Sequence, residues 1–345
     1  MPSNTPEASR SGGTEAEASA KRFLVTGAKG FIGSWVVKVL LERGDRPSIL
    51  DLDPHSHRLR ALFSEEQLAS VSFIAGDVSK LEDVERAVSD HGITHVIHLA
   101  ALQVPFCVAN PPLGALVNVV GTVNVFETVK KHRDLVRKLV YASSAAVYGT
   151  PEFYGADHIT DDAPLEPATL YGVFKQCNEG TARVYYARDG ISSVALRPST
   201  VYGAGRDQGL TSGPTKAIKA CVAGRPYTIR FTGPADLQYA RDTAITFIRA
   251  AESNLEGARI YTPRGAVVSM EEFLAAIERQ FPEARRLIRA AGNPLPVPAD
   301  VENTAIRRDL PDLPSTPLDE GIRETAQIFG RLQQENRLDL RELDV

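Results

Sequence analysis

The sequence predicts an α/β fold in which helices cover both faces of a parallel, doubly wound sheet. Between about residues 22 and 200, short β-branched runs alternate with amphipathic stretches of helical length. The apolar run at 22–26 leads through a glycine-rich turn into residues 34–43, whose apolar side chains recur at helical spacing. After residue 200, Pro and Gly become denser and strand patterns rarer. We therefore expect a sheet domain over residues 21–200 and a smaller cap, mainly over 201–345, from which one strand returns to the sheet.

Six strands are expected in the first domain, at residues 22–26, 47–51, 71–75, 94–99, 137–143 and 192–197. The run Gly257–Thr262 reads as the later strand that returns to the sheet. Ser269 and Glu272 form a capping-box pattern that predicts a helix start, and a final helix is expected over about 318–331. Residues 1–20 are polar and without periodicity, which predicts a disordered tail rather than a signal peptide.

Three glycines mark the turn between the first strand and the first helix. Gly27, Gly30 and Gly33 stand in the segment TGAKGFIG. A strand, a glycine turn and a helix in this order predict a dinucleotide site of the Rossmann type. Gly27 permits the tight turn, Gly30 lets the backbone approach a pyrophosphate, and Gly33 lets the helix pack closely on the strand. The free N–H groups of the helix N-terminus then point at the phosphates.

Two acidic residues are candidates for contacts with the adenosine half of the dinucleotide. Asp51 ends the second strand about 20 residues past the glycines, where a Rossmann unit places the group that binds the ribose. A carboxylate there repels a 2′-phosphate, so NAD is favoured over NADP. Asp53 competes for this role, and a solvated strand-end carboxylate is the alternative. Asp77 ends the third strand and accepts either from the adenine amino group or, as an N-cap, from the helix at 80–89.

The candidate catalytic residues follow in two later segments. The fifth strand ends in hydroxyls that include Ser144, while Tyr171 and Lys175 are four residues apart and share one face of a helix. A free Tyr side chain has a pKa near 10 and is a poor base at neutral pH, and we expect the Lys175 ammonium to lower that pKa. Tyr171 would then remove a hydroxyl proton, Ser144 would hold the substrate oxygen, and Lys175 would grip the nicotinamide ribose. His98 is interpreted as a packed strand histidine rather than a catalytic one.

Composition limits the partners and the compartment. The chain has 345 residues, 43% of them hydrophobic and 24% charged, and a net charge of -4. This balance gives no electrostatic reason to expect nucleic acid or an anionic membrane as a partner. Cys107, Cys177 and Cys221 show no C-x-x-C spacing, so we expect neither structural disulfides nor a metal site, and a reducing cytoplasm. No apolar run approaches the length of a transmembrane helix.

In combination, these motifs resemble the extended short-chain dehydrogenase/reductases of the NAD-dependent epimerase/dehydratase family. The resemblance runs from about Lys21 to Phe329 and rests on the segments TGAKGFIG, GDV, HLAA, SSAAVYG, YGVFK and LRPSTVYG. It implies NAD as the cofactor, a small sugar-type substrate, a homodimer, and a catalytic triad of Ser144, Tyr171 and Lys175. Besides the three glycines, the implied cofactor contacts are Phe31, Ile32, Asp51, Asp77, Val78, Leu99, Ala100, Ala101, Tyr171, Lys175 and Pro198. The implied substrate contacts are Gln103, Ser144, Ala145 and Arg206. Asn118 matches an Asn near the active site of the family, with helix packing as its alternative role.

Departures from the family pattern narrow the reaction and the substrate. The family's 4,6-dehydratases carry Asp-Glu directly after the catalytic hydroxyl, whereas this chain has Ala145 and Ala146, so dehydration is not expected. An Arg that contacts the diphosphate in sugar-nucleotide members is replaced near Ala235, and a late Arg-x-Gly-Asp is missing. Three other arginines either replace these contacts or serve as surface and ion-pair residues: Arg206, Arg230 and Arg241.

These observations favour an NAD-dependent oxidoreductase or epimerase that oxidises a secondary hydroxyl of a sugar or sugar-derived substrate. Because the diphosphate contacts are missing, a substrate without a nucleotide is preferred. A UDP-sugar 4-epimerase of the UDP-glucose type is the first alternative. A non-catalytic NAD-sensing protein is the second, although such a sensor would not need the Tyr171 and Lys175 pair.

Overall fold

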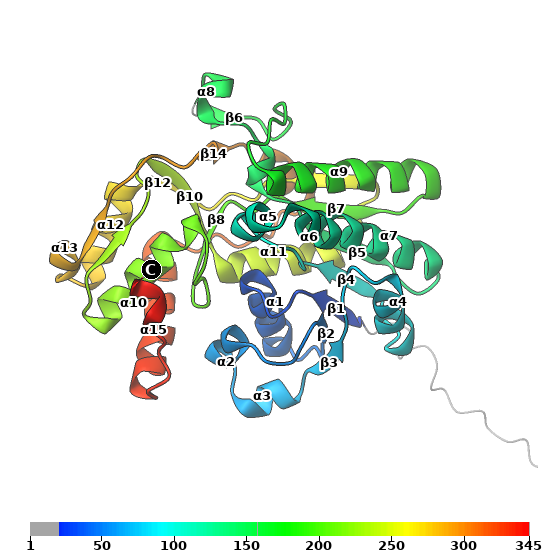
Figure 1. Cartoon of the computed structure of the whole chain (residues 1–345), viewed down its shortest axis with the longest axis horizontal. Helices are drawn as coiled ribbons and strands as arrows, with labels where there is room; N and C mark the ends of the chain where they lie inside the picture. The colour runs from blue at the N-terminus through cyan, green and yellow to red at the C-terminus, as the bar shows by residue number, and fades with distance from the viewer. Residues whose placement is uncertain (1–20, 157, 345) are drawn as a thin grey trace, which may run out of the picture.

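A seven-stranded parallel sheet forms the centre of the protein. The computed structural model describes residues 21–156 and 158–344, so the tail expected over residues 1–20 lies outside the described residues. The strand order is β11-β7-β5-β4-β1-β2-β3, and every neighbouring pair is parallel (Figure 1). The seven strands are β1 (Phe23–Thr26), β2 (Ser48–Asp51), β3 (Ser72–Ala75), β4 (His95–His98), β5 (Lys138–Ala142), β7 (Ser193–Leu196) and β11 (Ala258–Tyr261). The predicted fold class is confirmed, and all seven strands lie within the predicted ranges.

Helices cover both faces of this sheet (Figure 1). The main ones are α1 (Phe31–Glu42), α11 (Ala240–Glu252), α4 (Leu81–Asp90), α7 (Gly121–Lys131) and α9 (Leu170–Asp189). Alternating side chains of β1 explain the two layers. Phe23 and Val25 belong to the core on the side of α1 and α11, and Leu24 belongs to the core on the side of α4, α7 and α9.

The cap is a second, smaller layer built around a three-stranded sheet. Its order is β12 (Ala266–Ser269), β10 (Pro234–Tyr239) and β8 (Thr200–Tyr202), with β10 antiparallel to β12 and parallel to β8. Its larger helices are α10 (Gly213–Ala223), α12 (Met270–Gln280) and α15 (Leu318–Gln334). The capping box of Ser269 and Glu272 is present at the start of α12. The final helix extends three residues beyond the expected end at 331.

Short elements complete the described chain. The helical ones are α2 (His57–Leu62), α3 (Glu65–Ala69), α5 (Val104–Ala109), α6 (Pro111–Ala115), η2 (Leu116–Val120), η3 (Ala145–Val147), α8 (Pro151–Tyr154), η4 (Leu210–Ser212), α13 (Ala284–Leu287), α14 (Thr304–Asp309) and η5 (Arg341–Asp344). The strands are β6 (His158–Ile159), β9 (Tyr227–Ile229), β13 (Ile288–Ala290) and β14 (Asp300–Val301).

Two features differ from the organisation expected from the sequence. Besides β11, the late helix α11 also joins the sheet domain, because its buried residues Ala244, Phe247 and Ile248 pack in the same core as α1. The elements α6, η2 and α7 form one helical stretch, Pro111–Lys131, which is long and apolar enough to cross a membrane by length and composition alone. Its buried side chains, Val125 and Phe126 among them, pack in the core beneath α4 and α9.

Candidate active site

Ser144 and Tyr171 meet where the start of α9 presses against the turn that follows β5. Thr169 caps α9, its Oγ1 accepting a hydrogen bond from the Gly172 N–H at 3.1 Å, so Tyr171 lies in the first helical turn. A Cβ at Gly172 would lie 2.1 Å from the Ala146 carbonyl oxygen, which shows how closely the two segments approach. This contact brings the hydroxyls of Ser144 and Tyr171 into hydrogen-bonding contact.

The electrostatics of this pair differ from the expectation in two respects, the direction of the Tyr171 pKa shift and the groups that act on it. Burial raises the pKa of Tyr171, while the hydrogen bond with Ser144 and the charge of Arg206 act to lower it. Lys175 was expected to provide the lowering. Its Nζ lies 5.6 Å from the centre of the Tyr171 ring and donates to the Ala142 carbonyl oxygen at 2.7 Å. Burial lowers the pKa of Lys175 to about 8.

A buried ion pair anchors the catalytic helix and was not predicted. Glu179, on α9, accepts hydrogen bonds from Arg197 Nε and Nη2, both at 2.8 Å, and from Ser143 Oγ at 2.6 Å. Arg197 Nη1 donates to the Tyr148 hydroxyl at 2.7 Å. The network therefore joins α9 to residues that follow β5 and β7, and Ser143 in this network directly precedes Ser144. The sequence contained one indication of this role. Glu179 stands four residues after Lys175 and therefore lies on the same face of the helix.

The glycine turn has the shape that a dinucleotide requires. Gly27 has a φ of 69°, and a Cβ there would lie 2.5 Å from the Ala100 nitrogen. A Cβ at Gly33 would lie 2.4 Å from the Gly27 carbonyl oxygen, so α1 packs directly on the turn. Gly30 is the N-cap of α1, with no side-chain cap and no acidic residue in the first turn. The N–H groups in the first turn of α1 are therefore available for a pyrophosphate, and the residues present fit the dinucleotide.

The structure distinguishes the acidic candidates. Asp51 lies at the end of β2 beside the turn, where it accepts from the Lys29 N–H at 3.1 Å, and burial raises its pKa. Asp53 is more exposed and pairs with Lys29 Nζ at 2.5 Å. Asp77 accepts from the Ser79 N–H at 2.9 Å, whereas α4 begins after Lys80 without a side-chain cap. The alternative role of Asp77 as an N-cap is therefore wrong, because the carboxylate closes a turn before the helix.

The segment after β4 is held in place from the neighbouring helix. Asn118, in the π-helical turn η2, accepts from the Leu102 N–H at 2.7 Å and donates to the Leu102 carbonyl at 2.9 Å. The thiol of Cys107 also donates to this carbonyl, at 3.3 Å. Asn118 and Cys107 thus fix the backbone between Ala101 and Gln103. His98 is buried between Thr26 and Thr122, and burial lowers its pKa to about 3, so it is a neutral core residue.

The remaining site residues fall into two groups. The predicted cofactor contacts Phe31, Ile32, Val78, Leu99, Ala100, Ala101 and Pro198 lie on the glycine turn, on α1 or just beyond strand ends of the sheet. Ala145 is buried and donates its N–H to the Pro198 carbonyl at 3.0 Å. Gln103 and Arg206 converge on Gly209, since a Cβ there would lie 3.3 Å from Gln103 Oε1 and 3.5 Å from Arg206 Nη2. Arg241 instead forms an ion pair with Glu42 of α1 at 2.7 Å. Within residues 21–156 and 158–344, no group of three His, Cys, Asp or Glu side chains is arranged to hold a metal ion.

Comparisons with known proteins agree with this geometry. The model of the NAD dependent epimerase/dehydratase family matches residues 23–262. UDP-glucose 4-epimerase of Mycolicibacterium smegmatis is 32% identical over 91% of this chain and 100% of its own length. A solved structure of the Thermus thermophilus UDP-glucose 4-epimerase in complex with NAD has a TM-score of 0.73 and 30% identity, covering 89% of this chain and 98% of that one.

A partial consensus L-threonine 3-dehydrogenase, with a TM-score of 0.77 and 23% identity over 90% of this chain and 99% of its own, shares the fold. These matches extend over most of the chain and include both the glycine turn and the catalytic helix. NAD is therefore the cofactor, and the protein is an enzyme. The chain belongs to the NAD-dependent epimerase/dehydratase family.

Proposed function

We propose that the enzyme oxidises a secondary hydroxyl of a sugar or sugar-derived substrate. The observation that carries the proposal is the convergence of Ser144, Tyr171 and Lys175 beside a turn that fits a dinucleotide. Tyr171 is the proton-transfer residue, and Ser144 holds the substrate oxygen and the phenol in one hydrogen-bonded unit. Lys175 donates a hydrogen bond to the Ala142 carbonyl, and it would hold the nicotinamide ribose of the cofactor. The carbon whose hydroxyl Tyr171 deprotonates would lose its hydride to bound NAD, which would supply the hydride acceptor.

Two net outcomes are compatible with this site. Release of the ketone product makes the enzyme a dehydrogenase, and return of the hydride to the other face makes it an epimerase. The name of the M. smegmatis relative supports the second outcome with a UDP-sugar. Dehydration lacks support, because Ala145 and Ala146 replace the acid and base that elimination of water requires.

Two observations favour a substrate without a nucleotide. Ala235 is buried in β10 where an Arg of sugar-nucleotide enzymes would stand. Arg241 is paired with Glu42. A diphosphate is usually held by several positioned Arg side chains through bidentate hydrogen bonds, and such a set is incomplete here. The UDP-sugar 4-epimerase remains the alternative function.

A substrate panel with the NAD-loaded enzyme tests the proposal. Aldoses, aldonates and UDP-sugars are supplied in turn, NADH formation is followed by absorbance, and the stereochemistry of the products is determined. We expect oxidation or epimerisation of a compound without a nucleotide, and no binding of UDP by calorimetry at concentrations of about 1 mM, because the Arg clamp is incomplete. Micromolar affinity for UDP together with interconversion of UDP-sugar epimers would reject the proposal and establish the alternative.

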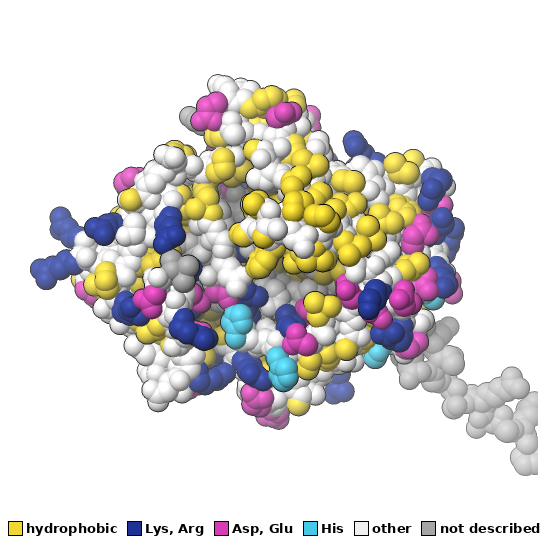
Figure 2. Space-filling model, in the orientation of Figure 1, with side chains coloured by type: hydrophobic (Ala, Val, Ile, Leu, Met, Phe, Trp, Pro, Cys, Tyr) yellow, Lys and Arg dark blue, Asp and Glu magenta, His cyan; other side chains and the backbone are white. Residues whose placement is uncertain are grey.

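We also propose that the enzyme is a homodimer formed through an apolar helical face. Figure 2 shows hydrophobic side chains gathered over α5, α6 and α9. The exposed apolar residues of these helices and of η2 are between 41 and 67% exposed: Phe106, Val108, Leu113, Leu116, Val120, Leu170, Val173, Val184 and Tyr186. A twofold axis beside this face lets both copies bury the same patch, since an isologous contact uses one surface twice. The occupant we propose is therefore a second copy of the chain.

Charge in the apolar helical face should dissociate the dimer. We expect the double variant Val120→Glu/Val184→Glu to be a monomer at concentrations where the unmodified enzyme is a dimer, because four carboxylates would be buried in one interface. Sedimentation velocity reports the mass. Phe153→Glu, an exposed apolar residue on α8, is the control and should leave the mass unchanged. A monomeric unmodified enzyme at all concentrations would contradict the proposal.

The free cysteine thiols favour a reducing compartment. Cys107, Cys177 and Cys221 are free, and Cys177 is exposed. An exposed thiol persists where the surroundings are reducing. We propose a reducing cytoplasm as the location, which fractionation with an antibody to the chain would test.

A further inference from the structure

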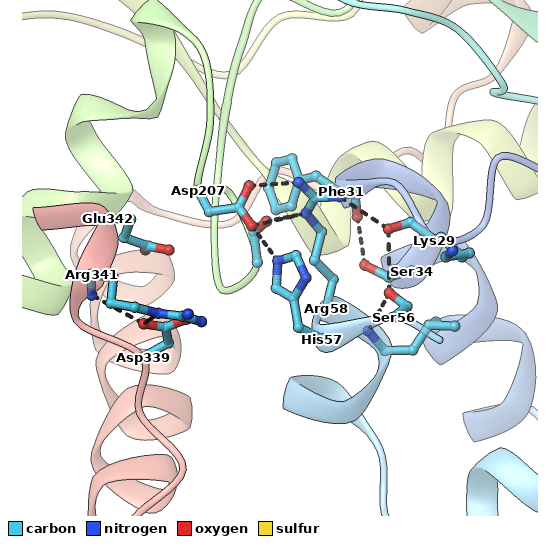
Figure 3. Close-up of polar contacts among 12 residues, drawn as sticks. Lys29, Phe31, Ser34, Ser56, His57, Arg58, Asp207, Asp339, Arg341 and Glu342 are labelled. Carbon is cyan, nitrogen blue, oxygen red and sulfur yellow. Dashed lines mark hydrogen bonds and ion pairs between the residues drawn. The ribbon is translucent and has the colours of Figure 1, made fainter. Parts of the chain in front are cut away.

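Two adjacent residues of opposite charge follow β8 and have very different surroundings. Asp207 is buried and forms an ion pair with Arg58 of α2, with Nη2 at 2.7 Å and Nε at 3.2 Å. It also contacts His57 Nε2 at 2.5 Å. Figure 3 shows Arg58 and His57 both directed at this carboxylate. The negative charge of Asp207 is therefore compensated by α2.

Arg206 has no such partner. Among the side chains of residues 21–156 and 158–344, its one hydrogen bond runs from Nη2 to Thr211 Oγ1 at 2.7 Å. No carboxylate in this part of the chain lies within 4.0 Å of it, and its buried Nε has no acceptor. The guanidinium lies 5.8 Å from the centre of the Phe31 ring. An Arg side chain stays charged in proteins, so the fold holds a half-buried cation that forms no ion pair among the described residues, although the charge of Asp207 acts on it.

This cation lies at the edge of the candidate active site, 5.8 Å from the centre of the ring of Phe31 at the start of α1. Its charge acts to lower the pKa of Tyr171. Gly209, with a φ of 85°, leaves open the space between Gln103 Oε1 and Arg206 Nη2. Thr211 and the Phe31 ring restrain the guanidinium before any ligand arrives. A half-buried Arg that forms no ion pair and is restrained in this way is suited to an anionic group of a ligand.

We propose that the substrate carries a carboxylate and that Arg206 binds it. This inference rests on the proposed function and specifies its substrate class: a sugar acid, such as an aldonate or a uronate, whose secondary hydroxyl faces Tyr171 and Ser144. A carboxylate is chosen over a phosphate because one uncompensated guanidinium matches one negative charge. The neighbouring Arg58, which would be needed as a second cation, is committed to Asp207. A neutral sugar would leave the guanidinium without an ion pair and is therefore rejected.

Matched pairs of ligands test this inference on the NADH-loaded enzyme. Calorimetry is carried out with D-galacturonate and D-gluconate, with the neutral sugars D-galactose and D-glucose, and with D-galactose 1-phosphate. We expect at least one acid to bind about 100-fold more tightly than its neutral counterpart, in line with a buried charge-assisted hydrogen bond. Three results would overturn the inference: equal affinity for the acid and the neutral sugar, tighter binding of the phosphate, or no binding of either acid at about 10 mM. A positioned ion pair would give binding well below that concentration.

Variants separate a binding role of Arg206 from a structural one. Arg206→Gln should remove the preference for the acid and leave the affinity for NADH unchanged, while Arg206→Lys keeps the charge and should retain part of the preference. The thermal midpoint of Arg206→Gln should not fall, because the variant removes a half-buried charge that forms no ion pair. Arg230→Gln, which changes an exposed arginine of the cap, is the matched control and should keep the full preference.

This inference and the proposed function would fail on different experimental results. An Arg206→Gln variant that loses affinity for acid and neutral sugar alike would overturn the role assigned to Arg206. The proposed function fails on a different result, namely the absence of NADH formation and of product epimers from every compound without a nucleotide. Calorimetry still measures the preference for the acid in that case, because it does not depend on turnover.

Discussion

The Tyr171→Phe variant should lose about two to four orders of magnitude in kcat, the usual contribution of a positioned acid or base. Phe retains the ring that packs beside Lys175 and removes only the hydroxyl that contacts Ser144. The fold and the affinity for NAD should therefore be preserved. Turnover is measured by NADH absorbance with the compound that the substrate panel identifies, and NAD affinity by calorimetry.

A second tyrosine on the same helix provides the control for this variant. Tyr186 is exposed near the C-terminal end of α9, so Tyr186→Phe should leave kcat unchanged. Near-normal turnover by a folded Tyr171→Phe enzyme would remove this phenol from the mechanism. A loss of NAD affinity in parallel with kcat would instead indicate that the ring supports the cofactor site.

Removal of the Glu179 carboxylate should have the largest effect on stability. Glu179→Ala leaves the guanidinium of Arg197 buried without its counter-ion, because the two side chains are only 3 and 6% exposed. The free energy of unfolding should fall by about 3–5 kcal/mol, as for other buried pairs from which one partner is removed. Urea denaturation followed by circular dichroism measures the change.

Two further variants show whether the loss arises from the uncompensated charge. Glu85→Ala removes a carboxylate from an exposed pair with Lys131 and should cost less than about 1 kcal/mol. The double variant Glu179→Leu/Arg197→Met should be more stable than Glu179→Ala, since neither charge is then left buried alone. A Glu179→Ala protein as stable as Glu85→Ala would show that the pair does not anchor α9.

The parts of the site that depend on local spacing were predictable from the sequence. The glycine turn, the acidic end of β2 and the pair Tyr171 and Lys175 each lie within a few residues of a recognisable strand or helix, so periodicity alone places them. The pair of Arg58 and Asp207 was not predictable, because the two residues are 149 positions apart and belong to different layers. The direction of the Tyr171 pKa shift was also missed, because burial after folding raises the pKa, and the groups that act to lower it are Ser144 and Arg206 rather than the nearby Lys175.

The return of α11 and β11 to the sheet domain affects how the protein must fold. Residues 21–200 leave one side of α1 uncovered until residues 240–261, which come after part of the cap, have been added. The edge of β7 likewise has no partner until β11 pairs with it. The sheet domain is therefore completed late in synthesis, and the nascent chain exposes both an apolar helix face and an open strand edge until then. The sheet domain and the cap therefore form a single cooperative unit. The cap cannot unfold by itself, because the chain segments that connect it to α11 and β11 also complete the sheet domain.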